Sequence, residues 1–585
     1  MGRSTPAVAR TRPGSGDVEA LLRQALDDSR AGRAEHAEAT LRRVIDERPG
    51  EHRAAELLAV MCAERGDADE AVALLEAAAA HVGAPSRATV PFHNNRANAL
   101  RRAGRLGEAE HLLRELVAIA PDEWQPWHNL GQVLRDQGRH DEALAALRRA
   151  TGLEPGYGAN HAVVGELLHK LGRFNSARAA LRRGIELGCA GDPNAWSLLA
   201  NAHRHLGLLD DAIEHFRRAV SLSDGAAYAR SNLGVALALA GHLDEALREF
   251  DLALAQDPDD DTVCANAAYA HLTAGRLDTG WALWEHGIRG GPRGRERLPE
   301  GVRRWAPDDQ GTCVLVYREQ GVGDEILFAS VYPDLIAVAP AVIVECDRRL
   351  TGLFARSFPD ATVRAFSFDP ARGGETIVPP DFDRAIPAGS LPRHFRPDIA
   401  SFPDRRSYLV PDPARVSRWR ERLAGHTRPI VGISWRSIVK TAERRLEYTQ
   451  LREWGEILTI PGVTWVNLQY DDCERELREA ERRFGVEVLR WPWLDLMNDF
   501  DEVAALTSCL DHVVAPRNAV AMLSGALGVP TTMMGNAWDW SDLGTGRSPW
   551  FPSVELAVRE HRNDWDGVLA HAARRVAALA SATDR

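Results

Sequence analysis

The pattern of apolar and polar positions changes once along the chain, near residue 300. Before that point, from about Asp17 to Arg293, a pattern of about 34 residues recurs eight times. After it, short apolar runs alternate with amphipathic stretches. A fixed period near 34 predicts stacked pairs of helices, and the alternation predicts a parallel sheet covered by helices on both faces. The sequence therefore predicts an all-α array followed by an α/β region.

Small residues mark each repeat at fixed places. A glycine recurs at gaps of 34, 35 or 38 residues, at Gly32, Gly66, Gly104, Gly138, Gly172, Gly207, Gly241 and Gly275. We expect each glycine to end the first helix of its repeat in a left-handed backbone conformation. Five residues later stands Ala37, Ala71, Ala109, Ala143, Ala177, Ala212, Ala246 or, in the eighth copy, Gly280. A small side chain there lets the two helices of the repeat approach closely.

The remaining positions of the repeat identify its type. Packing residues fall at Trp127, Leu130, Gly131, Ala143, Ala150 and Pro155. The segment resembles a tetratricopeptide array, which implies a superhelix whose concave wall holds a peptide or a protein. Nine residues before the turn glycine stand Asn95, Asn129, Asn232 and Asn266. In the protein O-GlcNAc transferases, which also place such repeats before a catalytic domain, asparagines at this position grip the acceptor protein. The alternative is that the asparagines only pack the array.

Composition limits the possible functions. The 585 residues are enough for about three or four domains. A net charge of −12 disfavours nonspecific nucleic-acid binding, and seven scattered cysteines without a CxxC pair suit the cytoplasm and disfavour structural zinc. No apolar run approaches the length of a membrane span, and the first residues lack the apolar core of a signal peptide. We predict a tail at 1–16, the array at 17–293, a linker at 294–311, and two α/β halves at 312–411 and 412–585.

Each half has its own series of predicted strands. The first half has strands at 313–317, 341–345, 362–365 and 383–386. The second has strands at 430–435, 464–468, 486–489 and 512–514, and a strand at 531–534 that is expected to complete the sheet before a helix at 565–580. Two Rossmann-like halves in tandem describe the GT-B architecture, in which ligands bind at the carboxyl ends of the strands.

Several motifs in order carry a second resemblance. They are the run from Val314 to Ala329, the pair Trp281 and Trp284, and the segments 431–435, 466–469, 524–530 and 547–552. Together they resemble the glycosyltransferase domain that follows tetratricopeptide arrays in many bacterial proteins and is similar to the heptosyltransferases. The resemblance covers nearly the whole chain after Gly16.

The resemblance implies a catalytic base. In heptosyltransferases the aspartate of the Gly-Asp turn after the first strand is thought to take the proton of the acceptor hydroxyl, which points to Asp324 here. An aspartate at that place also suits an ordinary helix cap. Glu319 and Glu325 are weaker candidates for the same role.

Polar residues after the strands of the second half suggest a donor site. Ser434, Arg436, Ser437 and Lys440 follow the first of these strands and could clamp a phosphate, although a solvated loop has the same composition. Asn467 and Gln469 follow the next strand and could meet a nucleobase. Asn518 and Ala519 begin a helix whose N-terminus offers N–H groups to an anion.

That last turn departs from the related sequences. Where the family usually has Asp-Thr and then a histidine, this chain has Arg517, Asn518 and Met522. The change implies either an inactive adaptor or a changed donor, such as a CMP-activated acidic nine-carbon sugar whose carboxylate an arginine would hold. Asn536, Trp538, Asp539 and Trp540 could form a sugar platform, or the tryptophans could simply cover the sheet edge. The sequence shows no metal site and implies no cofactor.

The resemblance thus implies a cytoplasmic protein O-glycosyltransferase that moves a sugar from a nucleotide donor to a serine or threonine of a docked protein. In layout it is similar to bacterial flagellin glycosyltransferases, which attach a sialic-acid-like sugar. Two alternatives remain open: a non-catalytic adaptor, and a glycosyltransferase that acts on a capsular or lipid-linked glycan.

Overall fold

The computed structural model describes residues 15–288, 298, 301–309, 311–369, 374–376, 381–438, 448–559 and 565–583. Its contacts divide the chain into two compact units, Met1–Ala202 and His203–Arg585. Lys440, one of the predicted donor-binding residues, lies outside the described residues.

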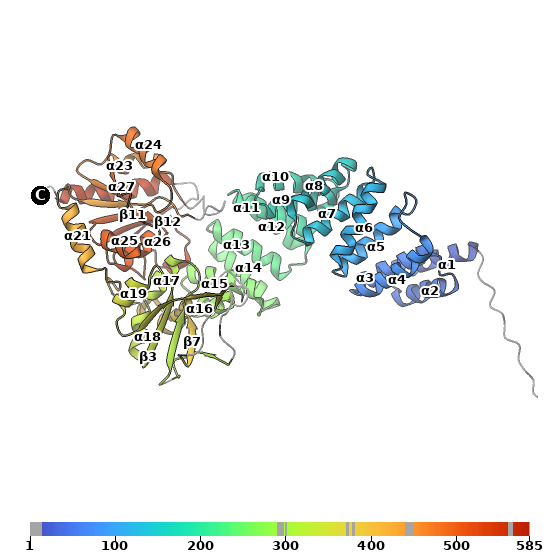
Figure 1. Cartoon of the computed structure of the whole chain (residues 1–585), viewed down its shortest axis with the longest axis horizontal. Coiled ribbons are helices and arrows are strands. Elements are labelled where there is room, and N and C mark those ends of the chain that lie inside the picture. Colours follow the sequence, from blue (N-terminus) through green and yellow to red (C-terminus); the bar gives the residue numbers. More distant parts are fainter. Residues whose placement is uncertain are drawn as a thin grey trace, which may run out of the picture. The chain divides into compact units, whose positions relative to one another are not determined.

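The first unit consists of helices joined by short turns (Figure 1). They are α1 (Ser15–Arg30), α2 (Ala34–Glu47), α3 (His52–Arg65), α4 (Ala68–Val82), α5 (Val90–Arg102), α6 (Leu106–Ile119), α7 (Trp124–Asp136), α8 (His140–Leu153), α9 (Gly158–Lys170) and α10 (Phe174–Glu186). Each helix packs against the next, so no repeat buries its apolar face alone. The helix α11 (Pro193–His205) crosses the division between the units.

The glycine and alanine predictions are confirmed. All eight turn glycines have positive φ, between 69° and 93°. The seven alanines five residues later are at most 1% exposed. At the eighth copy, a β-carbon added to Gly280 would lie 2.7 Å from Leu272, which shows how tightly the last pair of helices packs.

The second unit begins with further repeat helices and continues into two sheets. Its repeat helices are α12 (Leu209–Leu222), α13 (Ala227–Leu239), α14 (Leu243–Gln256), α15 (Asp261–Thr273) and α16 (Leu277–Trp284). Trp281 and Trp284 belong to the same apolar core as Phe328 and Trp550 of the α/β region. The last repeat and the α/β region therefore share one core.

The first sheet has the order β1-β7-β2-β3-β4, and its strands are parallel. They are β1 (Arg303–Arg304), β2 (Cys313–Tyr317), β3 (Ala341–Cys346), β4 (Thr362–Ala365) and β7 (Arg384–Pro387). The connecting helices are α17 (Val322–Ala329), α18 (Tyr332–Val338) and α19 (Thr351–Ser357), with α20 (Leu391–Phe395) after β7. A small antiparallel pair, β5 (Ser367–Asp369) and β6 (Gly374–Thr376), lies between β4 and β7 in sequence.

The second sheet has six parallel strands in the order β10-β9-β8-β11-β12-β13. They are β8 (Ile430–Ile433), β9 (Thr464–Asn467), β10 (Val488–Leu489), β11 (His512–Pro516), β12 (Thr531–Asn536) and β13 (Val554–Arg559). The accompanying helices are α21 (Pro413–Leu423), α23 (Gly455–Leu458), α24 (Glu474–Phe484), α25 (Phe500–Thr507), α26 (Ala519–Ala526) and α27 (Trp565–Thr583). The prediction that the strand at 531–534 completes the sheet is wrong, because β13 pairs with β12 outside it.

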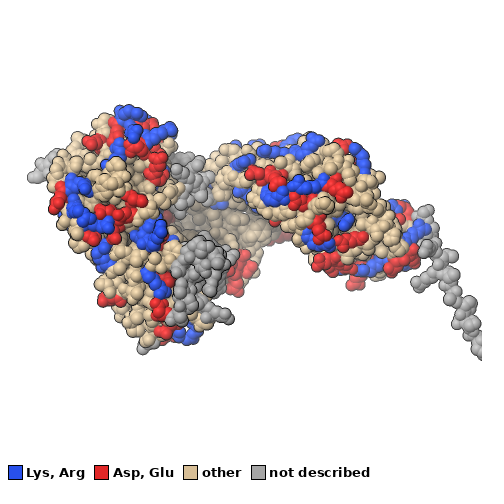
Figure 2. All heavy atoms as spheres, viewed as in Figure 1, with Lys and Arg blue, Asp and Glu red and all other residues tan. Residues whose placement is uncertain are grey.

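Two further observations bear on function. Among the described residues, no helix is long and apolar enough to cross a membrane, and no group of His, Cys, Asp and Glu is arranged to hold a metal ion. Acidic and basic side chains are intermingled over the face drawn in Figure 2. The described residues of that face therefore form no extended basic stripe of the kind that nucleic-acid binding requires.

Candidate functional site

A cavity of about 340 Å³ lies where the carboxyl ends of the two sheets face each other. Its lining comes from the loops after β2, β3, β8, β9 and β11 and from the segment that enters α25. The lining residues are Gly321, Val322, Gly323, Asp324, Arg349, Ser437, Ile438, Tyr448, Tyr470, Leu496, Met497, Phe500, Val503, Arg517, Asn518, Ala519, Val520, Met522 and Leu523. Parallel α/β sheets bind ligands at this end, so the cavity is the candidate site.

Two helices, one from each half, begin at the cavity. A β-carbon added to Gly323, in the first turn of α17, would lie 3.6 Å from the Cα atom of Ala519, the first residue of α26. The side chain of Asn518 caps α26 by accepting hydrogen bonds from the N–H groups of Val520 (3.0 Å) and Ala521 (3.2 Å). A helix N-terminus carries partial positive charge, so two of them at one cavity favour an anion.

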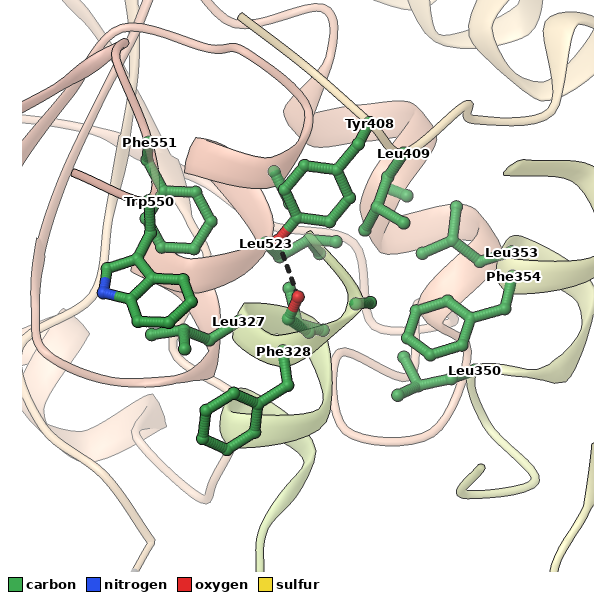
Figure 3. Packing of buried hydrophobic residues seen from close by; sticks show 14 of the residues in the cluster. Leu327, Phe328, Leu350, Leu353, Phe354, Tyr408, Leu409, Leu523, Trp550 and Phe551 are labelled. Carbon is green, nitrogen blue, oxygen red and sulfur yellow. Dashed lines mark hydrogen bonds between the residues drawn. The ribbon is translucent and has the colours of Figure 1, made fainter. Parts of the chain in front are cut away.

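The two helices α17 and α26 pack on a common apolar core (Figure 3). Leu327 and Phe328 of α17 and Leu523 of α26 lie among Tyr408, Trp550 and other buried residues. The Tyr408 hydroxyl donates a 2.6 Å hydrogen bond to the carbonyl oxygen of Ile326. This core ties both helix N-termini to one position.

Of the three candidate carboxylates, Asp324 lines the cavity. Its Oδ2 atom accepts a 3.1 Å hydrogen bond from the N–H of Gly321, so the carboxylate also caps α17. The helix-cap role is therefore present, and the position at the cavity allows a second role beside it.

The other two carboxylates are buried away from the cavity lining. Glu325 lies 2.9 Å from Arg318 Nε and accepts a 2.8 Å hydrogen bond from the N–H of Asp347, and burial raises its pKa to about 7. Glu319 is 3% exposed and lies so close to Gly389 that a β-carbon there would be 1.9 Å from its Oε1 atom. The structure thus gives both glutamates buried positions.

Ser434, Gln469 and Asn518 form a buried hydrogen-bond network beneath the cavity. Gln469 Oε1 accepts from the Ser434 hydroxyl and from the N–H of Trp435, both at 3.0 Å. Asn518 Nδ2 donates to Ser434 Oγ at 2.9 Å. The network holds together the loops after β8, β9 and β11. Ser434 and Gln469 do not line the cavity, so the structure shows them bracing the walls.

The two arginines predicted to bind the donor, Arg436 and Arg517, pair with carboxylates of the same unit. Arg436 lies 2.9 Å from Asp471 and also binds Glu476, and it does not line the cavity. Arg517 lines the cavity, but its guanidinium binds Asp542 and donates a 3.1 Å hydrogen bond to the hydroxyl of Ser541. Neither guanidinium presents its charge to the cavity in the way the sequence suggested.

Ser437 lines the cavity as expected, together with residues that sequence reasoning missed. The Tyr470 hydroxyl lies 3.3 Å from Ser437 Oγ. Arg349 donates to both carboxylate oxygens of Asp347, at 2.8 and 2.9 Å, and to the carbonyl oxygen of Met497 at 3.2 Å. The available signal was the charged run 347–349 directly after β3, which parallels the run after β2.

The predicted sugar platform does not line this cavity. Asn536 Oδ1 accepts a 2.7 Å hydrogen bond from Arg559 Nε, and the Asp539 side chain accepts hydrogen bonds from Ser541. The Trp540 ring packs against Trp284 with the centroids 4.8 Å apart. Trp538 is 42% exposed and lies against Gly241 of the seventh repeat. The two tryptophans therefore contact the last two repeats, and the β12 edge that they were expected to cover is paired with β13.

Three of the four repeat asparagines donate to the preceding repeat. Asn95 Nδ2 donates to Glu56 Oε1 (2.8 Å), Asn129 Nδ2 to Asn94 Oδ1 (3.0 Å), and Asn266 Nδ2 to the Ser231 hydroxyl (3.1 Å). Asn232 and Asn266 are half-buried. Each of these bonds links two repeats, which gives the asparagines a packing role and leaves the binding role a prediction.

Comparisons with known proteins agree with the repeat assignment. Tetratricopeptide repeat models match residues 22–87, 94–157 and 165–227, and a second such model matches 204–272. The chain is 32% identical over 392 residues to Protein FlbA of Caulobacter vibrioides, a match that covers 65% of this chain. The match covers 66% of FlbA, just under two thirds of that relative's length.

Three solved structures match parts of the chain at low TM-scores. They include Cut9-Hcn1 of the APC/C (17% identity, TM-score 0.37, 47% of this chain and 52% of that one) and the tetratricopeptide protein YrrB (20%, 0.27, 30% and 90%). Another is pilF of Pseudomonas aeruginosa (19%, 0.31, 36% and 94%). On the repeat models, the chain carries tetratricopeptide repeats between residues 22 and 272, as the spacing of its glycines predicts.

Proposed function

We propose that the chain is a protein O-glycosyltransferase of GT-B architecture, which transfers a sugar from a nucleotide donor to a serine or threonine of a protein docked on the repeats. One observation carries the proposal. A cavity at the carboxyl ends of both parallel sheets combines two helix N-termini with the carboxylate of Asp324.

Each part has a chemical task in glycosyl transfer. As the bond from the sugar to the nucleotide breaks, negative charge grows on the leaving phosphate, and the N-termini of α17 and α26 stabilise that charge. The Asp324 carboxylate takes the proton of the acceptor hydroxyl as the new bond forms. The tyrosine, methionine and phenylalanine side chains of the lining offer an apolar wall for the nucleobase.

The repeats bind the acceptor protein. Tetratricopeptide arrays generally bind protein partners, and the 32% identity to FlbA extends over a length greater than the repeats alone. Flagellin as the acceptor, a sialic-acid-like sugar from a CMP donor and a cytoplasmic location are the finer parts of the proposal, and they rest on the family resemblance.

A second candidate is a non-catalytic adaptor. One specific observation favours it. Arg517 replaces the usual aspartate of the family, and its guanidinium pairs with Asp542 and donates a hydrogen bond to Ser541. An adaptor would keep the repeats and the fold without binding a nucleotide.

Equilibrium binding of CMP, UDP, ADP and GDP to the full chain separates the two candidates. Ala519→Asp places a carboxylate at the first residue of α26 and is expected to weaken nucleotide binding at least tenfold. Ala34→Asp makes the same change at the first residue of α2, far along the chain, and is expected to leave binding unchanged. Saturable binding with this difference supports the transferase. Absence of binding to all four nucleotides would favour the adaptor.

A further inference from the structure

We propose that Arg517 and Asp542 are positioning residues whose ion pair ties the N-terminus of α26 to repeats seven and eight, so that these repeats form a working part of the nucleotide site. The connection runs through residues 537–544, which we call the bridging segment. As a statement about the nucleotide site, the inference rests on the proposed function. As a statement about the connection, it stands on the geometry alone.

On one side, the bridging segment is held by the turns of the last two repeats. A β-carbon added to Gly241 would lie 2.8 Å from the ring of Trp538. A β-carbon added to Gly275 would lie 3.1 Å from the carbonyl oxygen of Leu543, and one added to Gly544 would lie 2.8 Å from the backbone nitrogen of Gly275. Two consecutive repeat turns thus contact the segment, the seventh through the Trp538 side chain and the eighth backbone to backbone.

The backbone of the segment is shaped for this contact. Leu543 has φ +50°, in the left-handed region that residues with a β-carbon rarely adopt, and Gly544 follows with φ +71°. Such a conformation in a leucine persists only where the surroundings enforce it, and such positions gather at functional sites. Between the two contacts, Trp540 packs on Trp284 and lies 6.3 Å from Tyr269 of the eighth repeat, measured between ring centroids.

On the other side, the segment holds Arg517. The guanidinium binds Asp542, donates to the Ser541 hydroxyl at 3.1 Å, and lies 3.7 Å from Asp539. The arginine backbone N–H donates to the carbonyl oxygen of Met534 at 3.1 Å. The side chains of Arg517 and Asp542 are 11% and 7% exposed. Breaking a buried pair of this kind is costly, because it removes the main counter-charge of the other member, so the two residues hold each other in place.

The arginine transmits the position of the segment to the cavity. Arg517 directly precedes Asn518, whose side chain caps α26, and both residues line the cavity beside Ala519. A displacement of the bridging segment therefore displaces the start of α26. A protein bound on repeats seven and eight would act on the nucleotide site through the same path.

Hydrogen exchange on the full chain tests the connection without any ligand. In Asp542→Asn, exchange is expected to speed up about tenfold in α26 and also in the repeat turns 239–243 and 273–277. Asp309→Asn is the matched control, because it breaks the Arg384–Asp309 pair, whose side chains are 20% and 19% exposed. The control is expected to leave all three segments unchanged. Faster exchange in α26 with unchanged repeat turns, or no change in either, would overturn the proposal.

Nucleotide affinity tests the positioning role. Arg517→Met and Asp542→Asn are each expected to lower the nucleotide affinity by a similar factor. The double variant is expected to lower it by no more than either single variant. The affinity for the corresponding nucleoside, which lacks the phosphate, should fall by the same factor. A loss confined to Arg517→Met and to the phosphorylated ligand would show a direct contact and overturn the positioning role. If none of the four nucleotides binds, the proposed function fails, while hydrogen exchange still decides the connection.

Discussion

The ring of Trp538 lies against Gly241, so closely that a β-carbon on the glycine would be 2.8 Å from the indole. Gly241 therefore serves two purposes. It ends the first helix of the seventh repeat with φ +87°, and it admits an aromatic side chain from the bridging segment after β12. The repeat period alone predicts the first purpose and gives no sign of the second.

Gly241→Ala is expected to destabilise the second unit more than an ordinary change at a left-handed glycine. Any residue with a β-carbon costs about 1–2 kcal/mol in this conformation. At Gly241 the alanine must also displace Trp538. Gly485→Ala is the control, because Gly485 ends α24 with φ +68° and has nothing within 4 Å of its added β-carbon. Denaturant unfolding followed by tryptophan fluorescence gives both losses, and equal losses would contradict the contact.

A fragment that begins at residue 300 is expected to be far less soluble than one that begins at Pro193. The shorter fragment removes Trp281 and Trp284, which pack on Phe328, Trp540 and other aromatic residues of the α/β region. Their loss exposes a large apolar surface, which favours aggregation. Size-exclusion chromatography and binding of a hydrophobic dye measure the difference. Equal behaviour of the two fragments would show that the last repeats are dispensable for the α/β fold.

The repeats and most strands could be predicted because their signals are local. Glycine at the turn, alanine at the helix contact and short apolar runs each reflect the backbone within a few residues. The strand β13 was missed because Val554–Arg559 is short, lacks a clear alternation of apolar and polar residues, and follows a long stretch rich in turns. An edge strand of that composition resembles a loop until its pairing with β12 is known.

The interactions of the site residues were predicted less completely, because these side chains pair with residues that are distant in the sequence. The position of Asp324 at the cavity follows from its place after the first strand. The pairing of Arg517 with Asp542 does not follow, since the two residues are 25 positions apart and the intervening chain forms a helix, a strand and a loop. Arg436 likewise pairs with Asp471 and Glu476, which follow β9, so its charge is neutralised within the protein.

Asp324→Asn is expected to lower the rate of sugar transfer about 10²–10⁴-fold while nucleotide affinity changes little, because general base catalysis contributes a factor of that order. Part of any effect could come from the helix cap, since Asp324 accepts from the N–H of Gly321. Asp499→Asn controls for that loss, because Asp499 caps α25 through the N–H of Glu502. Transfer is measured with a labelled donor, and an unchanged rate in Asp324→Asn would remove Asp324 as the base.

Asn129→Ala and Asn94→Ala separate packing from binding in the array. Both changes remove the 3.0 Å hydrogen bond between the two repeats, and each is expected to lower stability by about 1 kcal/mol. If the Asn129 amide also binds the acceptor backbone, Asn129→Ala weakens acceptor binding and Asn94→Ala does not. Thermal unfolding and acceptor affinity are measured on the same variants, and equal affinities would assign the asparagine to packing alone.

His512 is expected to make the second unit sensitive to acid. The ring is 1% exposed, its Nε2 atom lies 2.8 Å from the Thr532 hydroxyl, and burial lowers its pKa from 6.5 to about 4. Arg575 adds to the shift in the same direction. At pH values between these two pKa values, His512 binds a proton in the unfolded chain but not in the folded chain. The free energy of unfolding therefore falls as the pH is lowered from about 6.5 to 4, by about 3 kcal/mol from this residue.

His512→Gln keeps a neutral hydrogen-bonding side chain and removes the titration. Relative to the natural chain, this variant is expected to lose stability at pH 7 but to lack the fall in the free energy of unfolding that His512 contributes between pH 6.5 and 4.5. The comparison matters because buried Glu325 and Asp542, whose pKa values burial raises to about 7 and about 6, shift stability the opposite way in the same range. Both chains carry those two groups, so the difference between their unfolding curves isolates His512. The control His571→Gln changes a half-buried histidine beside Glu555, and parallel pH curves for the natural chain and His512→Gln would contradict the prediction.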